Sequence, residues 1–160
     1  MAKRSLVYVC VDVENMPAHP YAEHIRQFSK QYGQTCQTRL RAYAVDWTMR
    51  EKPRTTFQHA GFLTLRVKPG DNAVDNKILR YGITSSMNRL CQQDAYILVT
   101  GDSDYIELVQ VLRQLGKYVI CLTSKRCKSS QKLLESVHEH YFLEELPQLL
   151  AQSHEILPAA

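Results

Sequence analysis

Residues 95–105 read AYILVTGDSDY, and this stretch carries the clearest structural signal in the chain. It begins with an uninterrupted apolar run, which is typical of a short strand buried on both faces of a parallel sheet. Thr100 ends the run, and a glycine and two aspartates follow before Tyr105. The next residues repeat apolar side chains at helical spacing as far as Gly116, a helix-stop residue. We therefore expect a buried strand, an acidic turn and a helix in direct succession.

The same continuous apolar character occurs in residues 5–12 and 118–123, which we also expect to be buried strands. Two further strand candidates, residues 38–45 and 62–67, alternate more and therefore suit more exposed positions. Helical patterns fall between the strands. The expected helices cover residues 21–31, 75–91, 105–115, 129–137 and 143–150, with a weaker candidate at 48–60. The alternation predicts an α/β fold, a three-layer α/β/α sandwich around a mainly parallel five-stranded sheet.

Length and composition limit the kind of protein. The 160 residues suit one domain, expected over residues 1–150, with a frayed C-terminal tail over 151–160. The formal net charge of +4 permits a nucleic-acid partner without arguing for one. Five cysteines without a Cys-x-x-Cys pair are typical of a reducing, cytoplasmic setting. We expect no signal peptide and no membrane partner, and the sequence leaves a homodimer open.

Acidic residues follow two of the predicted buried strands. Asp12 ends the first strand, with Glu14 and Asn15 directly after it, and Asp102 and Asp104 follow the strand at 95–100. Ligands bind beyond the carboxyl ends of strands in open α/β sheets. Carboxylates that converge there repel one another unless a cation intervenes, and hard divalent cations prefer oxygen ligands. The pattern therefore predicts a Mg²⁺ or Mn²⁺ site, while the alternative is that these residues only form turns and cap helices.

Three motifs resemble the NYN-domain family, a branch of the PIN-like nuclease superfamily. They are VDVEN at 11–15, GDNAVDNKIL at 70–79 and VTGDSDY at 99–105, and the resemblance extends over roughly residues 5–145. It implies a PIN-like, Rossmann-like parallel α/β sheet with an acidic Mg²⁺ or Mn²⁺ pocket, and phosphodiester hydrolysis, usually of RNA. By position it also implies the catalytic, metal-binding set. That set is Asp12, Asp75, Asp102 and Asp104.

Other residues are candidates for holding the substrate, which we expect to be single-stranded RNA. The resemblance implies that Asn15 positions a ligand or water, and that Thr100 and Ser103 hydrogen-bond metal-bound waters or a phosphate. A basic group follows the strand at 118–123 and could hold the RNA backbone, although a solvated loop is the alternative for each cation. This group contains Lys125, Arg126 and Lys128. Base stacking is a further option for Tyr105, Trp47 and Tyr43, with core packing as its alternative.

Three functional hypotheses follow. The first is a metal-dependent endoribonuclease. The second is a catalytically impaired module that binds RNA or a protein, because Asn72 and Tyr81 stand where many family members have a lysine and a second aspartate. The third is phospho-acceptor chemistry, which would combine the acids with Thr100 and Lys125 but needs an aspartate closing the third strand, and Asp71 comes late for that role.

Overall fold

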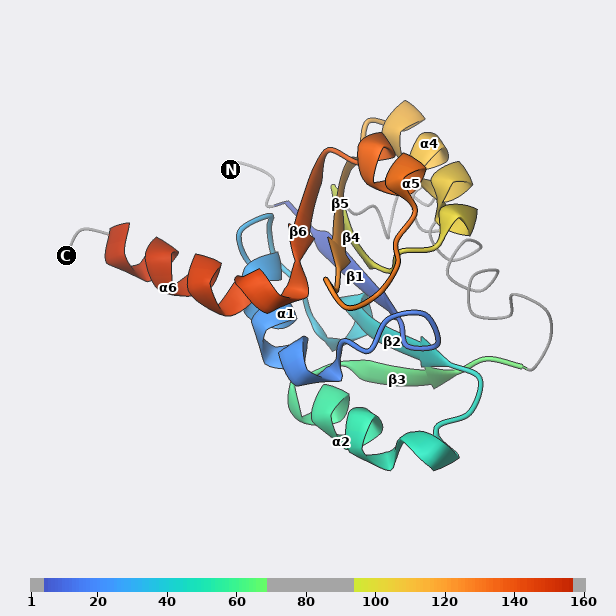
Figure 1. Cartoon of the computed structure of the whole chain (residues 1–160). Coiled ribbons are helices and arrows are strands. Elements are labelled where there is room, and N and C mark those ends of the chain that lie inside the picture. Colours follow the sequence, from blue (N-terminus) through green and yellow to red (C-terminus); the bar gives the residue numbers. More distant parts are fainter. Residues whose placement is uncertain (1–4, 69–93, 157–160) are drawn as a thin grey trace.

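The computed structural model describes residues 5–68 and 94–156. Asp75, with the motif at 70–79 and the helix expected at 75–91, lies outside these residues. The described chain forms one parallel sheet in the order β3-β2-β1-β4-β5-β6 (Figure 1). The strands are β1 (Val7–Asp12), β2 (Leu40–Ala44), β3 (Leu63–Arg66), β4 (Ala95–Val99), β5 (Tyr118–Thr123) and β6 (Glu139–Phe142). The α/β class and the parallel sheet are as predicted, but the sheet has six strands, not five.

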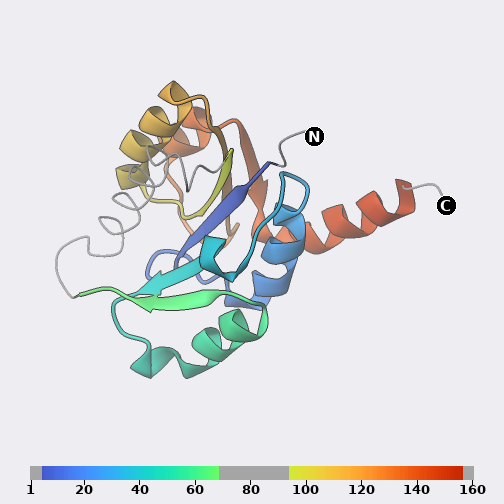
Figure 2. The ribbon, with the colours of Figure 1, turned by 180° about the vertical axis from the view of Figure 1, so that it is seen from behind.

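Helices lie on both faces of this sheet (Figures 1 and 2). They are α1 (Ala22–Ser29), α2 (Glu51–His59), α4 (Ile106–Gln114), α5 (Gln131–Ser136) and α6 (Leu146–Ile156). The side chains of Val7, Val9 and Val11 join the core beneath α1, α2 and α6. Tyr8 and Cys10, which point the other way along β1, join the core beneath α4 and α5. Because both faces are covered, β1 is buried throughout, as its continuous apolar run predicts.

The strand that sequence reasoning missed is β6. It pairs in parallel with β5, with Leu122 opposite Tyr141. It has only four residues, EHYF, and all of them are half-buried. A half-buried edge strand of this length shows neither a continuous apolar run nor a clear alternation. Four residues are too few to display the periodicity that reveals longer strands.

The C-terminal helix extends further than the sequence indicates. The expected segment 143–150 begins as a short 3₁₀ helix, Leu143–Glu145, and α6 then continues to Ile156. Residues 151–156, expected to begin a frayed tail, are therefore helical. Leu146 and Leu150 of α6 are buried in the same core as α1, and this packing holds the helix in place. No helix within the described ranges is long and apolar enough to cross a membrane.

The strand order reverses between β1 and β4, the two central strands of the sheet. From β1 the chain adds strands outward through β2 and β3, and it then continues on the opposite side of β1 with β4. Such a reversal creates a crevice at the carboxyl ends of the two central strands, which is where open α/β sheets bind ligands. Val11 pairs with Val99, so Asp12 lies beside the turn that begins at Thr100. The two acidic motifs thus meet at the point where the strand order reverses.

Candidate active site at the carboxyl edge of the sheet

Among the predicted carboxylates that the structure describes, Asp12 is the most buried. Asp12 is 1% exposed, and burial of a carboxylate is costly unless hydrogen bonds or charges compensate for the lost water. Its Oδ2 accepts a hydrogen bond of 3.0 Å from the hydroxyl of Tyr105, and its Oδ1 accepts one of 3.2 Å from the backbone N–H of Asn15. Hydrogen bonds to a carboxylate stabilise it by roughly 1.5–3 kcal/mol each, which offsets part of the cost of burial. The two donors also fix the orientation of the carboxylate.

Asn15 joins the two central strands. Its Oδ1 accepts hydrogen bonds from the backbone N–H of Gly101 at 2.8 Å and from the hydroxyl of Thr100 at 3.1 Å. The Thr100 oxygen in turn accepts from the backbone N–H of Asp102 at 3.3 Å. A chain of hydrogen bonds therefore runs from Asp12 through Asn15 to the acidic turn after β4. The oxygens of Asn15 and Thr100, predicted as ligand contacts, make these contacts within the protein.

Asp102 and Asp104 occupy different positions on that turn. Asp102 is the N-cap residue of the 3₁₀ helix Ser103–Tyr105, and its Oδ1 accepts from the backbone N–H of Asp104 at 3.0 Å. The capping interpretation is therefore correct for Asp102. A carboxylate has about four acceptor sites on its two oxygens, so capping still allows a further ligand. Asp102 is half-buried, whereas Asp104 and Ser103 are exposed.

Gly101 allows the loop before α5 to approach this turn closely. A Cβ atom at this position would lie 2.4 Å from Ser129 Oγ and 2.8 Å from Ser129 Cβ, which is closer than such atoms can come. The carbonyl of Gly101 accepts from the backbone N–H of Ser130 at 2.8 Å, and the Ser130 hydroxyl caps α5. Ser129 Oγ is buried, with no hydrogen-bond partner in the described part of the chain. The site therefore includes a third segment, between β5 and α5.

The described residues do not complete a metal site by themselves. Across residues 5–68 and 94–156, no three His, Cys, Asp or Glu side chains lie close enough together to hold a metal ion. The predicted set of four carboxylates includes Asp75, which is outside these ranges. What the structure does bring together is Asp12 and the turn of Asp102, through oxygen-bearing groups of the kind that Mg²⁺ and Mn²⁺ prefer.

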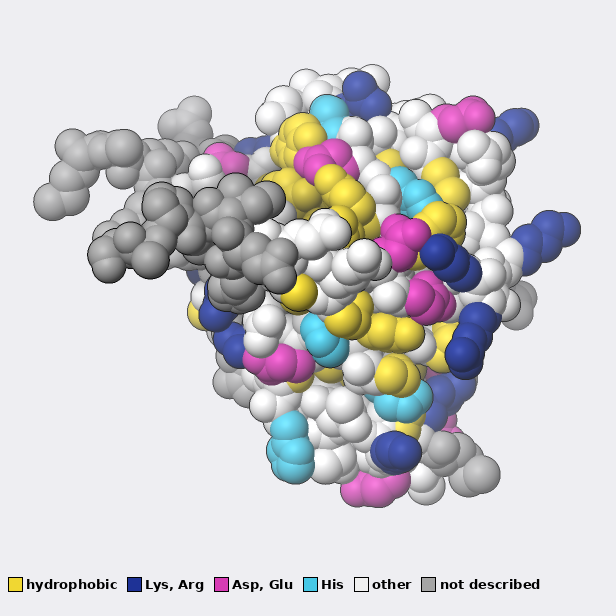
Figure 3. Space-filling view, turned by 60° about the vertical axis from the view of Figure 1, so that its left-hand side comes forward, with side chains coloured by type: hydrophobic (Ala, Val, Ile, Leu, Met, Phe, Trp, Pro, Cys, Tyr) yellow, Lys and Arg dark blue, Asp and Glu magenta, His cyan; other side chains and the backbone are white. Residues whose placement is uncertain are grey.

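The basic residues after β5 differ in how they are engaged. Lys125 Nζ lies 2.9 Å from a carboxylate oxygen of Glu145 and 5.3 Å from the ring centroid of Phe142, so its charge is directed toward the start of α6. The hydrogen bond that Lys125 donates to Glu145, together with the negative charge of Glu145, raises the pKa of Lys125. Arg126 and Lys128 are exposed. On the face shown in Figure 3, Lys and Arg side chains are scattered among acidic, histidine and hydrophobic ones and form no continuous basic surface.

Two residues near the site have roles that the sequence did not reveal. Tyr105 is 1% exposed and contacts Asp12, so it is not available to stack on a base. The only local signal is that a tyrosine directly follows the acidic motif. This signal does not indicate that its hydrogen-bond acceptor lies 93 positions earlier in the chain. Cys121 donates to the carbonyl of Thr100 at 3.1 Å, and burial raises its pKa to about 12. The thiol is therefore neutral at physiological pH, as expected for a buried cysteine of the core.

The NYN domain family matches this chain over residues 6–144, and the chain belongs to that family. The domain has a PIN-like fold of the nuclease type. No curated protein matches the chain. Among solved structures, a protein of unknown function from Vibrio parahaemolyticus RIMD 2210633 is similar, with a TM-score of 0.67 and 16% identity, covering 91% of this chain and 97% of that one. At this level of identity the likeness shows the fold alone.

Proposed function

We propose that the protein is a metal-dependent endoribonuclease that hydrolyses phosphodiester bonds at the carboxyl ends of β1 and β4. The observation that carries the proposal is the hydrogen-bonded connection from Asp12 through Asn15 to the turn of Asp102, at the reversal of strand order. Membership of a nuclease-type family supports hydrolysis. The choice of RNA as the substrate rests on the family resemblance.

The chemistry of the donors fits a hard divalent cation, since the groups at this edge are carboxylates. We assign Asp12, Asp102, Asp104 and Asp75 as the residues that would hold Mg²⁺ or Mn²⁺. When bound, such an ion would lower the pKa of a water molecule and offset negative charge on the phosphoryl oxygens. Asp12, Asp102 and Asp104 do not form a metal-binding group by themselves, so the proposal depends on Asp75 as a further ligand.

The other residues of the site have supporting roles in this proposal. Tyr105 and the backbone of Asn15 hold the Asp12 carboxylate in one orientation. Ser103 is exposed next to Asp102, and in this proposal its hydroxyl donates to a phosphate. Arg126 and Lys128 would contact the strand through its phosphates. Lys125 would have to leave Glu145 to do so, which is feasible because an exposed ion pair contributes at most about 1 kcal/mol.

The direct test is cleavage of labelled single-stranded RNA by purified protein with Mg²⁺, with Mn²⁺ and with EDTA. We expect cleavage that requires the cation and that is lost in Asp102→Asn. Asparagine is a good N-cap residue, so this variant keeps the turn while losing the charge. Glu107→Gln, which removes an exposed carboxylate from the first turn of α4, is the matched control and should cleave normally. Full activity of Asp102→Asn would refute the proposal.

A second candidate function is RNA binding without catalysis. The observation that favours it is that Asn72 and Tyr81 stand where many members of the family have a lysine and a second aspartate. The same experiment separates the two functions: RNA bound equally with Mn²⁺ and with EDTA, and never cleaved, would support the binding module.

A further inference from the structure

A second feature of the carboxyl edge is a hollow of about 660 Å³ beyond the ends of β2 and β3. Its walls come from the segment after β2, the start of α2 and the end of β3. Tyr43 of β2 pairs with Asp12, and Arg66 of β3 pairs with Ala44, so the hollow opens on the same edge of the sheet as the acidic site. A larger hollow of about 1080 Å³ lies at the opposite, amino-terminal edge, where Ser5 precedes β1 and Leu40 begins β2.

The hollow at the carboxyl edge is tied to the acidic site by Glu14. This residue follows Asp12 by two positions, and its carboxylate accepts from the backbone N–H of Val45 at 2.8 Å and from Arg50 at 2.7 Å. Val45 lines the hollow. Neighbouring strands lie about 4.8 Å apart, so β1 and β3 are separated by about 10 Å. A strand of RNA bound at Asp12 can therefore reach the hollow with its next nucleotides.

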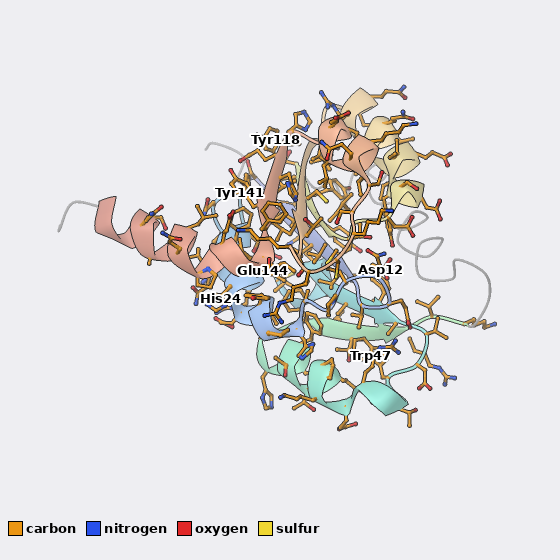
Figure 4. All side chains as sticks on the ribbon, viewed as in Figure 1. Asp12, His24, Trp47, Tyr118, Tyr141 and Glu144 are labelled. Atoms are coloured by element: carbon orange, nitrogen blue, oxygen red, sulfur yellow. The ribbon has the colours of Figure 1, made fainter. Side chains whose placement is uncertain are left out.

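Trp47 makes one wall of this hollow rigid. Its ring is 6% exposed, and its Nε1 donates to the carbonyl of Leu65 at 3.1 Å. Figure 4 shows Trp47 on the same side of the molecule as Asp12. The indole is thus committed to the core and to β3, and it shapes the hollow instead of offering a face for stacking.

The charged groups in the hollow suit a nucleotide. Arg54 and Arg66 are exposed, and neither forms a salt bridge with any residue that the structure describes, whereas Arg50 is engaged by Glu14. Asp46 and Glu51 also line the hollow. The pKa of Asp46 is lowered by the hydrogen bonds from Thr48 and by the charges of Arg66 and Arg50. The lining therefore combines guanidinium groups, which bind phosphate, with oxygen acceptors, which bind the amino groups of a base.

We propose that this hollow binds one nucleotide of single-stranded RNA, next to the bond held at Asp12 and Asp102, with Arg54 and Arg66 contacting its phosphate. The inference rests on the proposed function and names how that site holds its substrate. A volume of about 660 Å³ is within the usual range for small-ligand sites. A base can enter such a hollow only when it is unpaired, so the site selects single strands.

The test uses the double variant Arg54→Gln/Arg66→Gln and fluorescence anisotropy with a labelled single-stranded RNA. Binding is measured in EDTA over about 50–200 mM salt, so that it does not depend on cleavage. Each lost phosphate contact on a single strand reduces the slope of log K against log salt by about 0.7, so we expect weaker binding and a slope reduced by about 1.4. Both arginines are exposed, and circular dichroism and the melting temperature verify that the variant folds.

The matched control is Lys30→Gln/Arg39→Gln, which removes the same charge from the hollow at the amino edge. It should bind RNA with the wild-type slope, and the effect of the first variant should disappear with a double-stranded RNA of the same sequence. An unchanged slope in Arg54→Gln/Arg66→Gln, an equal loss in the control, or no binding of single-stranded RNA by the wild type would each overturn the inference. Normal binding with no cation-dependent cleavage would refute the nuclease proposal and leave the subsite standing.

Discussion

Glu139 and Asp102, two carboxylates at opposite edges of the sheet, both accept hydrogen bonds from the protein, yet they differ in the capacity that remains for a ligand. Glu139 begins β6 at the amino-terminal edge and accepts from the hydroxyls of Tyr32, Tyr118 and Tyr141, so both of its oxygens are used. At the carboxyl edge, Asp102 accepts only through Oδ1 among the described residues. Within the described part of the chain, three donors occupy Glu139 and one occupies Asp102, so Asp102 keeps more of its about four acceptor sites for a ligand.

Glu139 and Asp12 both accept hydrogen bonds from tyrosines, but the surroundings of those tyrosines differ. Tyr118 is 39% exposed and stacks on His138 with ring centroids 4.5 Å apart, so the Glu139 cluster reaches the surface. Tyr105 is buried and holds Asp12 from within the core. Substitutions at the surface cluster should therefore change stability slightly and activity not at all, while those at the buried pair should change activity most.

The largest effect is expected for Asp12→Asn. The substitution keeps the shape of the side chain but removes the negative charge that we propose binds the cation. RNA cleavage should therefore fall by more than about 100-fold, because loss of a residue that only orients a metal ligand already costs about 10–100-fold. Initial rates with Mn²⁺ measure this. Glu139→Gln serves as the control at the other edge, and a similar loss in both variants would erase the distinction between the two carboxylates.

Tyr105→Phe should have the next largest effect. Removal of the hydroxyl leaves Asp12 Oδ2 without this donor and frees the carboxylate to rotate, and losses of about 10–100-fold are typical when a residue that orients a metal ligand is removed. Cleavage rates as a function of Mn²⁺ concentration should show a higher half-saturation point as well as a lower maximum. Tyr8→Phe, which breaks the buried bond to Tyr43, tests whether any lost tyrosine hydroxyl has the same consequence.

Gly101→Ala should act on stability first. The added methyl group meets Ser129, and overpacking of this kind costs about 1–3 kcal/mol of unfolding free energy. Urea denaturation measures the loss. The double variant Gly101→Ala/Ser129→Gly removes the opposing side chain and should recover a large part of it, and no recovery would show that the clash does not involve Ser129.

Glu139→Gln should have the smallest effect, a loss of stability of about 1 kcal/mol or less, because the group is partly exposed. Burial raises the pKa of Glu139, but the hydrogen bonds from the hydroxyls of Tyr118, Tyr141 and Tyr32 together lower it by more. The pKa of Glu139 is therefore below its ordinary value. A lowered pKa stabilises the fold at neutral pH, and this contribution is lost as the pH falls through the folded-state pKa. The stability difference between wild type and variant should therefore shrink from about pH 7 to about pH 4; a difference that grows would contradict the assignment.

Local features of the site can be predicted from the sequence alone. Asp102 caps the turn beside it, an interaction between neighbours that composition and spacing predict. The convergence of Asp12 with the turn after β4 was also predictable, because parallel strands present their carboxyl ends at one edge. Glu14, by contrast, connects Asp12 to the segment after β2 across 31 positions, and no local pattern indicates such a contact.

The sequence by itself determined the strand–helix alternation, the burial of β1, β4 and β5, and the acidic motifs of an NYN domain. These depend on periodicity and on neighbours a few residues apart, which a linear chain displays directly. Only the tertiary structure decided that Tyr105 holds Asp12, that Lys125 turns toward Glu145, and that a hollow lies beside β3. Such contacts join distant parts of the chain, and they exist only after packing has fixed the distances between side chains.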